Sequence, residues 1–209
     1  TSTKGDITYD YLVVAPGLTY DFSLVPGLGE AMDKGVVCSN YTNPKHTWDV
    51  VKNFKGGTAL FTQPTTPIKC GGAPQKIMYL AESYFRKSGV RKKTDVVFAT
   101  AGTIIFGVKE IAETLMKVVN RKDINLRFYH KLVAVDGEKQ IAWYEMGKEI
   151  APGRCVVKSG EDQNNKLDES FQYNYKDVKV IRDGDRYGIH YDMLHTAPPS
   201  VAPKFVKES

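Results

Sequence analysis

The chain has 209 residues, of which 42% are apolar and 25% are charged, and a formal net charge of +5 at pH 7. A globular chain of this length can bury a substantial core. Its three cysteines form no CxxC pair, which argues against a disulfide framework and against a structural zinc site. No apolar run approaches the roughly 20 residues that a membrane-spanning helix requires.

The first half of the chain alternates between strand and helix patterns. YDYLVVA (9–15) and TALFT (58–62) are apolar runs bounded by proline and glycine, which is typical of buried strands. From Pro74 the apolar residues recur at helical spacing, and Gly89 provides a stop signal.

A second strand and helix repeat this pattern. DVVFAT (95–100) predicts a strand, the following apolar periodicity predicts a helix that ends near Asn120, and LRFYH (126–130) predicts a third strand. Strands and helices that alternate at this spacing indicate an α/β fold with a parallel sheet and right-handed crossovers.

The last third of the chain has a different pattern. Turn residues at 136–137 and at 183–185 stand between apolar runs and predict two antiparallel hairpins. Residues 158–176 are polar and predict a surface insertion.

One short run is strongly basic. RKSGVRKK (86–93) places five positive charges in eight positions, and we interpret it as a solvated helix C-terminus, where cations complement the helix dipole. A contact with a membrane surface is the alternative. Nucleic acid is not expected as a partner, because no recognition module or aromatic-interleaved basic stripe accompanies the run.

The most reactive side chain that the sequence predicts is Cys70, in the run TTPIKCGGAP. It lies four residues before Pro74, near the positive end of the predicted helix, and Lys69 and Lys76 are close in sequence. These features favour a thiolate, and the two glycines that follow allow another group to approach the sulfur. A buried and inert thiol is the alternative that the residues leave open.

A dinucleotide fingerprint is missing from the sequence. No GxGxxG occurs, and GTIIFG (102–107) lacks the inner glycine that close approach to a diphosphate requires. An NAD(P)H site after the strand at 58–62 is therefore not expected.

The remaining cysteines and histidines give no catalytic or metal site. Cys38 and Cys155 lie in loop-like surroundings and are interpreted as structural or incidental thiols. His190 and His195 are five apart on one predicted strand, so their side chains point to opposite faces and cannot share a metal ion. The other two histidines are isolated, and we expect no metal.

Two similar runs near the ends of the chain carry a family resemblance. YDYLVVAPG resembles the YDxLVxATG turn that closes the first half of the FAD domain in flavoproteins with two dinucleotide-binding domains, although Pro16 stands where many relatives have Thr. YDMLHTAPP resembles the second such turn. The run from SNYTNPKHT to YFRKSG, with KCGGAPQKIMYL at its centre, resembles the eukaryotic-type sulfide:quinone oxidoreductases almost without gaps.

The resemblance implies a division of the chain. Residues 1–20 would end the first half of the FAD domain, residues 21–190 would form an inserted Rossmann-like NAD-type domain with the added hairpins, and residues 191–209 would return into the FAD domain. The FAD fingerprint and the second redox cysteine of the family are not in this sequence, so we expect the chain to be an internal fragment.

The resemblance also implies a reaction. Sulfide would attack a sulfur bridge between Cys70 and a second cysteine outside the chain, which leaves one persulfide and one thiolate. Electrons would then pass through FAD to ubiquinone. The persulfide sulfur would go to a small-molecule acceptor. Lys76 would supply positive charge, and Ala15, Pro16 and Gly17 would lie along FAD.

The same resemblance places the whole enzyme at the mitochondrial inner membrane surface. We expect the 209-residue chain to fold but to bind neither FAD nor NAD by itself. Two alternatives remain at this stage, namely an NAD(P)H-dependent flavoprotein reductase of the same fold and a redox-inert binding domain.

Overall fold

Five parallel strands form the central sheet of the computed structural model, which describes residues 3–66, 68–145 and 180–208. In spatial order they are β2 (Val37–Cys38), β10 (Met193–Thr196), β3 (Gly57–Gln63), β4 (Thr94–Thr100) and β5 (Asn125–Arg127). Each neighbouring pair is parallel. All their carboxyl ends therefore meet at one edge.

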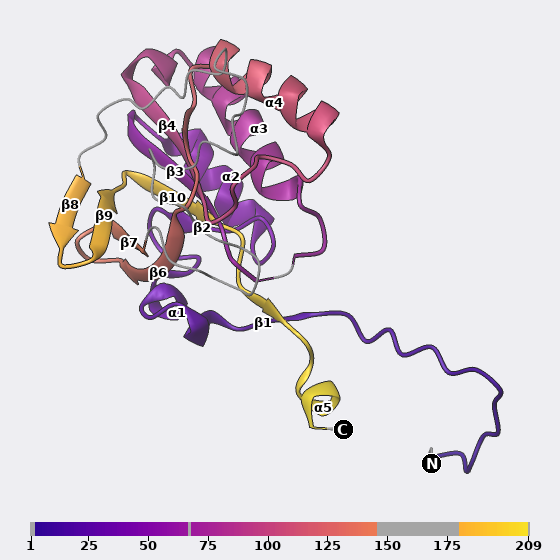
Figure 1. The fold of residues 1–209 in the computed structure, drawn as a ribbon. Coiled ribbons are helices and arrows are strands. Elements are labelled where there is room, and N and C mark those ends of the chain that lie inside the picture. The colour runs from indigo at the N-terminus through magenta and orange to yellow at the C-terminus, as the bar shows by residue number, and fades with distance from the viewer. Residues whose placement is uncertain (1–2, 67, 146–179, 209) are drawn as a thin grey trace.

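The other strands and the helices surround this sheet (Figure 1). A four-stranded antiparallel sheet has the order β6 (Lys131–Asp136), β7 (Ile141–Glu145), β9 (Arg186–His190) and β8 (Val180–Asp183), and β1 (Thr19–Tyr20) pairs with β11 (Ser200–Val201). The helices are α1 (Leu28–Ala31), α2 (Pro44–Asn53), α3 (Ala73–Lys87), α4 (Lys109–Arg121), α5 (Lys204–Lys207) and the 3-10 turns η1 (Phe22–Leu24) and η2 (Val90–Lys93). No helix of the described residues is long and apolar enough to cross a bilayer.

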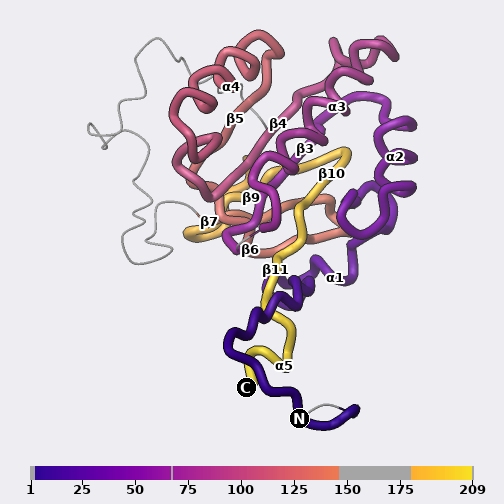
Figure 2. Tube along the Cα trace, turned by 90° about the vertical axis from the view of Figure 1, so that its right-hand side faces the viewer, coloured from indigo at the N-terminus to yellow at the C-terminus, as the bar shows by residue number. Residues whose placement is uncertain are grey.

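The core has two halves because successive side chains of a strand point to opposite faces. Phe61 of β3 and Phe98 of β4 face helices α2, α3 and α4, where they join Phe85. Leu60 faces the antiparallel sheet and packs in the same cluster as Tyr144. The domain therefore has three layers, with helices on one side of the parallel sheet and the antiparallel sheet on the other (Figures 1 and 2).

The sequence signals for α3 agree with its observed limits. Pro74 occupies the first turn, where its missing N–H has no cost, and Gly89 adopts a left-handed φ of +81° just after the helix. Met78 and Phe85 lie on the buried face. The expected α/β fold, the strands β3 and β4, both helices and both hairpins are confirmed, while the strand predicted at 126–130 is observed at Asn125–Arg127.

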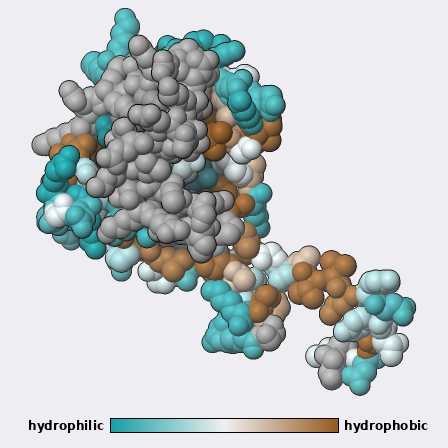
Figure 3. All heavy atoms as spheres, viewed as in Figure 1, coloured by the Kyte–Doolittle hydropathy of each residue, from teal (hydrophilic) through white to brown (hydrophobic). Residues whose placement is uncertain are grey.

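The strand predicted at residues 9–15 is wrong. These residues form no strand and are exposed, and Tyr11 and Val13 keep 94% and 87% of their accessible surface. An apolar extended segment becomes a strand only when another strand satisfies its backbone groups, and no described strand pairs with it. Figure 3 shows the apolar side chains gathered along this segment.

The similar run at residues 191–198 behaves differently. Its residues Met193–Thr196 form β10, which is buried and hydrogen-bonded between β2 and β3. The parallel sheet thus includes part of the range 191–209 that the resemblance assigns to the return into an FAD domain. The polar insertion predicted at 158–176 lies outside the described residues.

Candidate functional site at the carboxyl edge of the parallel sheet

Cys70 lies in the loop that leaves the carboxyl end of β3 and enters α3, as the sequence predicts. Its thiol is free and the residue is exposed. Ligands of open α/β sheets bind outside the carboxyl ends of the strands, so Cys70 is at the edge where chemistry is expected.

Backbone hydrogen bonds fix the main chain of this loop. The N–H of Ala73 donates to the carbonyl of Cys70 at 3.1 Å, and the N–H of Lys76 donates to the carbonyl of Gly72 at 3.0 Å. A Cβ on Gly71 would meet no atom within 4 Å, whereas a Cβ on Gly72 would touch the Phe106 ring at 3.7 Å. The end of the loop is therefore hydrogen-bonded to the first turn of α3, and the space beside Gly71 is open.

Contacts with two neighbouring segments hold the loop in place. The N–H of Ser200 donates to the hydroxyl of Thr66 at 3.0 Å, and the side-chain amide of Gln75 donates to the carbonyl of Ile105. The first contact ties the loop to β11, and the second ties the first turn of α3 to the segment that follows β4. Lys69 and Lys76, which the sequence places beside the site, are both exposed.

The residues that follow β2 also lie at this edge of the sheet, and this position could not be predicted from the sequence. The N–H of Asn40 donates to the Nε2 atom of His195 at 3.2 Å, and the N–H of Tyr41 donates to the hydroxyl of Ser39 at 3.3 Å. The same Nε2 atom lies 2.7 Å from the Oδ1 atom of Asn40, so Asn40 contacts the ring through both its backbone and its side chain. Burial lowers the pKa of His195 to about 3, so its ring is neutral at pH 7. The ring of Tyr41 packs edge-on against Tyr20, with centroids 6.4 Å apart.

The residues that the resemblance places along FAD lie on the exposed segment before β1. Gly17 has a φ of +79°, and a Cβ there would meet no atom within 4 Å. Ala15 and Pro16 are also exposed, and the small side chains of this run fit close approach by a flat cofactor at Gly17. The sequence has no GxGxxG loop for the diphosphate, so these residues fit only part of an FAD site.

The other cysteines and histidines are not arranged for chemistry. Cys38 lies on β2, so the prediction that it lies in a loop is wrong. Burial raises the pKa of its thiol to about 12, which supports the interpretation of Cys38 as an inert thiol. Cys155 lies outside the described residues. His190 and His195 lie on different strands, not on one, and no group of three potential metal ligands occurs among the described residues. Burial lowers the pKa of His130 to about 4.

The basic run is only partly solvated, which corrects its interpretation as a simple helix end. Arg86 and Arg91 both pair with the carboxylate of Glu82, which is 0% exposed, and Lys122 pairs with the same carboxylate. Two of the five cations of the run therefore stabilise a buried acid. Lys87, like the two lysines of η2, is exposed.

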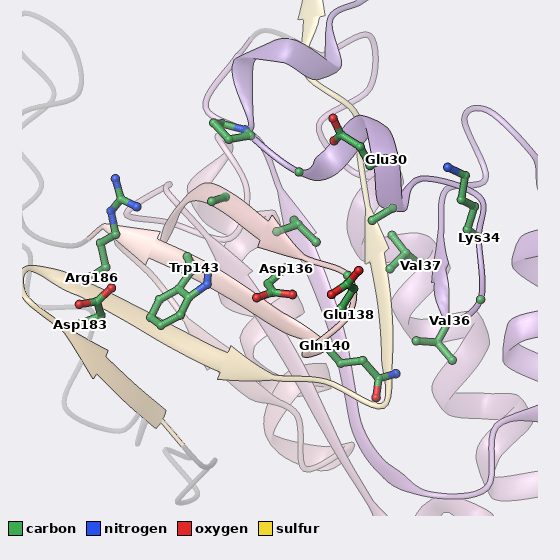
Figure 4. Close-up of a pocket in the computed structure, with 17 residues that line it drawn as sticks. Glu30, Lys34, Val36, Val37, Asp136, Glu138, Gln140, Trp143, Asp183 and Arg186 are labelled. Atoms are coloured by element: carbon green, nitrogen blue, oxygen red, sulfur yellow. The ribbon is translucent and has the colours of Figure 1, made fainter.

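A large cavity lies elsewhere in the domain. It has a volume of about 860 Å³ and lies between α1 and the β6–β7 hairpin, where Glu30, Lys34, Asp136 and Trp143 line it (Figure 4). No residue of the Cys70 loop contributes to its lining. We place the candidate site at Cys70 because this cavity is open to solvent and, among the described residues, its lining includes no cysteine, serine or threonine.

Comparisons with known proteins show what the whole chain is similar to. No protein-family model matches the chain. It is 36% identical over 211 residues to the mitochondrial sulfide:quinone oxidoreductase of Mus musculus and 35% identical over 212 residues to that of Dictyostelium discoideum. Both alignments cover 100% of this chain, which spans only 40% and 39% of the two relatives.

Solved structures show the same fold. The sulfide:quinone oxidoreductase from Aquifex aeolicus superposes with a TM-score of 0.60 at 15% identity, covering 98% of this chain and 40% of that one. NDH2 from Plasmodium falciparum in complex with NADH superposes with a TM-score of 0.56 at 10% identity, covering 97% and 37%. The chain thus has the fold of a segment of each of these two proteins.

Proposed function

We infer that this chain, which is related along its whole length to the mitochondrial sulfide:quinone oxidoreductases, is part of an enzyme that oxidises sulfide and reduces a quinone. The observation that carries this proposal is Cys70. It is an exposed thiol at the carboxyl edge of the sheet, one turn before α3, where a relative that uses NAD(P)H would have its glycine-rich loop.

The chemistry that Cys70 supports is thiol–disulfide exchange with sulfide. Hydrosulfide forms a sulfur–sulfur bond with one sulfur of a bridge between Cys70 and a second cysteine outside this chain. The bridge breaks, the other sulfur leaves as a thiolate, and the proton of hydrosulfide goes to solvent. One persulfide and one thiolate result, and the persulfide sulfur is passed to a small-molecule acceptor.

The cofactor that we propose for the whole enzyme is FAD, which when bound would accept the two electrons released when the thiolates of Cys70 and of the second cysteine form their bridge again, and would deliver them to a quinone. Ala15, Pro16 and Gly17 would lie along it. Lys76, on the first turn of α3, would place positive charge near the anionic sulfur of Cys70.

The setting of the enzyme follows from its relatives, which are named mitochondrial. We further propose that the enzyme lies on the surface of the inner mitochondrial membrane and takes its quinone from the lipid. Residues 21–190 would form the inserted NAD-type domain of this enzyme, and the flanking residues would belong to its FAD domain.

A chemical experiment tests the proposal without relying on turnover. The intact protein is treated with sulfide, trapped with an alkylating reagent and digested, and the peptide with Cys70 is examined by mass spectrometry. We expect an additional sulfur atom on Cys70 and none on Cys38, whose thiol is buried. If sulfide leaves Cys70 unmodified and persulfide accumulates elsewhere, the assignment of Cys70 is wrong.

A further inference from the structure

Gln75 is a polar residue on the buried face of α3. Its exposed fraction is 2%, and it shares this face with Met78 and Phe85. A buried amide is costly unless it is hydrogen-bonded, so the partner of Gln75 indicates what the side chain does. Its side-chain N–H donates to the backbone carbonyl of Ile105, which is 30 residues away along the chain.

The direction of this hydrogen bond differs from what the place of Gln75 in the helix predicts. Gly72 is the N-cap of α3, which makes Gln75 the third residue of the helix. In a capping box, a glutamine at this position turns back and accepts a hydrogen bond from the N-cap N–H. The amide of Gln75 instead reaches out of the helix to the β4–α4 loop (residues 101–108), so it joins two loops of the carboxyl edge.

The β4–α4 loop is itself anchored to the domain. Ile105 is buried in the core cluster on the helix side of the sheet, and the N–H of Tyr129 donates to the carbonyl of Gly102 at 3.2 Å. A second contact reaches the start of α3, where a Cβ on Gly72 would lie 3.7 Å from the ring of Phe106. The start of α3 is therefore held against a fixed loop at two points.

Cys70 is connected to these two points by a short stretch of backbone. Its carbonyl accepts a hydrogen bond from the N–H of Ala73 at 3.1 Å, so Cys70 is bonded to the first turn of α3. The stretch includes Gly71 and Gly72, and glycine restricts the backbone less than any other residue. A disulfide forms only when both sulfurs meet at a defined distance and angle. The position of the Cys70 sulfur thus depends on what holds the start of α3.

We propose that Gln75 is a positioning residue for Cys70. By holding the start of α3 against the β4–α4 loop, it returns the Cys70 sulfur to the same place each time the bridge to the second cysteine opens and closes. The bridge rests on the proposed function, whereas the fixing of the loop by Gln75 does not. A reactive group that is held in advance does not have to be ordered again in every cycle.

The first test measures the motion of the loop in the 209-residue chain. Gln75→Leu removes the amide and keeps a side chain of similar size. We expect the ¹⁵N order parameters of the Gly72 and Phe106 amides to fall from about 0.85 to below about 0.6. The control is Val119→Ala, which truncates a buried side chain near the other end of α4 and should leave both order parameters unchanged. Unchanged order parameters in Gln75→Leu overturn the proposal.

The second test measures the bridge in the intact protein. The protein is equilibrated with set ratios of reduced and oxidised dithiothreitol, and free Cys70 is alkylated and counted by mass spectrometry. In Gln75→Leu we expect the equilibrium constant for closing the bridge to fall about tenfold, which raises its reduction potential by about 30 mV, because the loosened loop must be ordered again. Val119→Ala, which lowers stability without touching either loop, should leave the constant unchanged. An unchanged constant in Gln75→Leu overturns the positioning role.

The two tests separate this proposal from the proposed function. If the intact protein forms no bridge at Cys70, the proposed function is wrong, and the order parameters still decide whether Gln75 fixes the loop. If Gln75→Leu fails to fold, hydrogen exchange in the unmodified chain decides. The side-chain amide of Gln75 and the backbone amide of Ala73 should then show protection factors that agree within about threefold, since one opening frees both. An Ala73 amide that exchanges much faster than the Gln75 amide would mean that the loop moves while Gln75 stays bound, and would overturn the proposal.

Discussion

The buried carboxylate of Glu82 gives the sharpest stability prediction. Its side chain is 0% exposed and pairs with Arg91, Arg86 and Lys122, whose side chains are 13%, 50% and 22% exposed. Glu82→Gln keeps the shape of the side chain and removes the charge, which leaves two largely buried cations without their acid. Breaking a buried ion pair from one side costs about 3–5 kcal/mol, and because these cations are partly solvated we expect about 3 kcal/mol.

The assay is urea unfolding of the 209-residue chain followed by circular dichroism, with a thermal melt as a check. For a chain of this size, 3 kcal/mol corresponds to a fall in Tm of about 6–12 °C. Glu110→Gln, at an exposed position of α4, is the matched control and should change the free energy of unfolding by less than about 0.5 kcal/mol. A loss below about 1 kcal/mol for Glu82→Gln would refute the reasoning that this carboxylate anchors the basic run.

Three further outcomes can be checked with standard measurements. Gly27→Ala should lower the free energy of unfolding, measured in urea, by more than about 2 kcal/mol. Gly27 has a φ of +78°, and a Cβ there would lie 2.0 Å from the carbonyl oxygen of Val135. Gly107→Ala is the control and should be nearly neutral, because the space around Gly107 is open. In the intact protein, sulfide should bleach the flavin absorbance and NADH should not, because no GxGxxG follows β3; bleaching by NADH would favour a reductase of the same fold. The 209-residue chain purified alone should be folded by circular dichroism and colourless, and a visible flavin band would mean that the cofactor contacts have been misplaced.

Local patterns predicted those elements whose partners are near in sequence. The apolar runs of β3 and β4 and the helical periodicity after Pro74 each point to one structure, because strand and helix have different repeat lengths. The hairpins follow from turn residues between apolar runs. The same local reasoning failed at residues 9–15, because a run becomes a strand only if another strand is available to pair with it.

Long-range features of the site could not be read from the sequence. β10 lies between β2 and β3 although it is far from both along the chain, and only this arrangement brings Tyr41 and Cys70 to one edge. Glu82 reads as an ordinary polar residue of an amphipathic helix, because its cations come partly from another segment. The position of Cys70 was predictable because its signals are all within a few residues.

The central claim is that Cys70 carries the sulfide chemistry. The most direct test is sulfide-dependent quinone reduction by the intact protein with Cys70→Ser, which retains size and polarity but cannot form a persulfide. We predict that turnover falls to background while bound flavin is retained, and that Cys38→Ala, at a buried thiol, retains turnover. Sulfide-dependent quinone reduction that persists in Cys70→Ser would contradict the account.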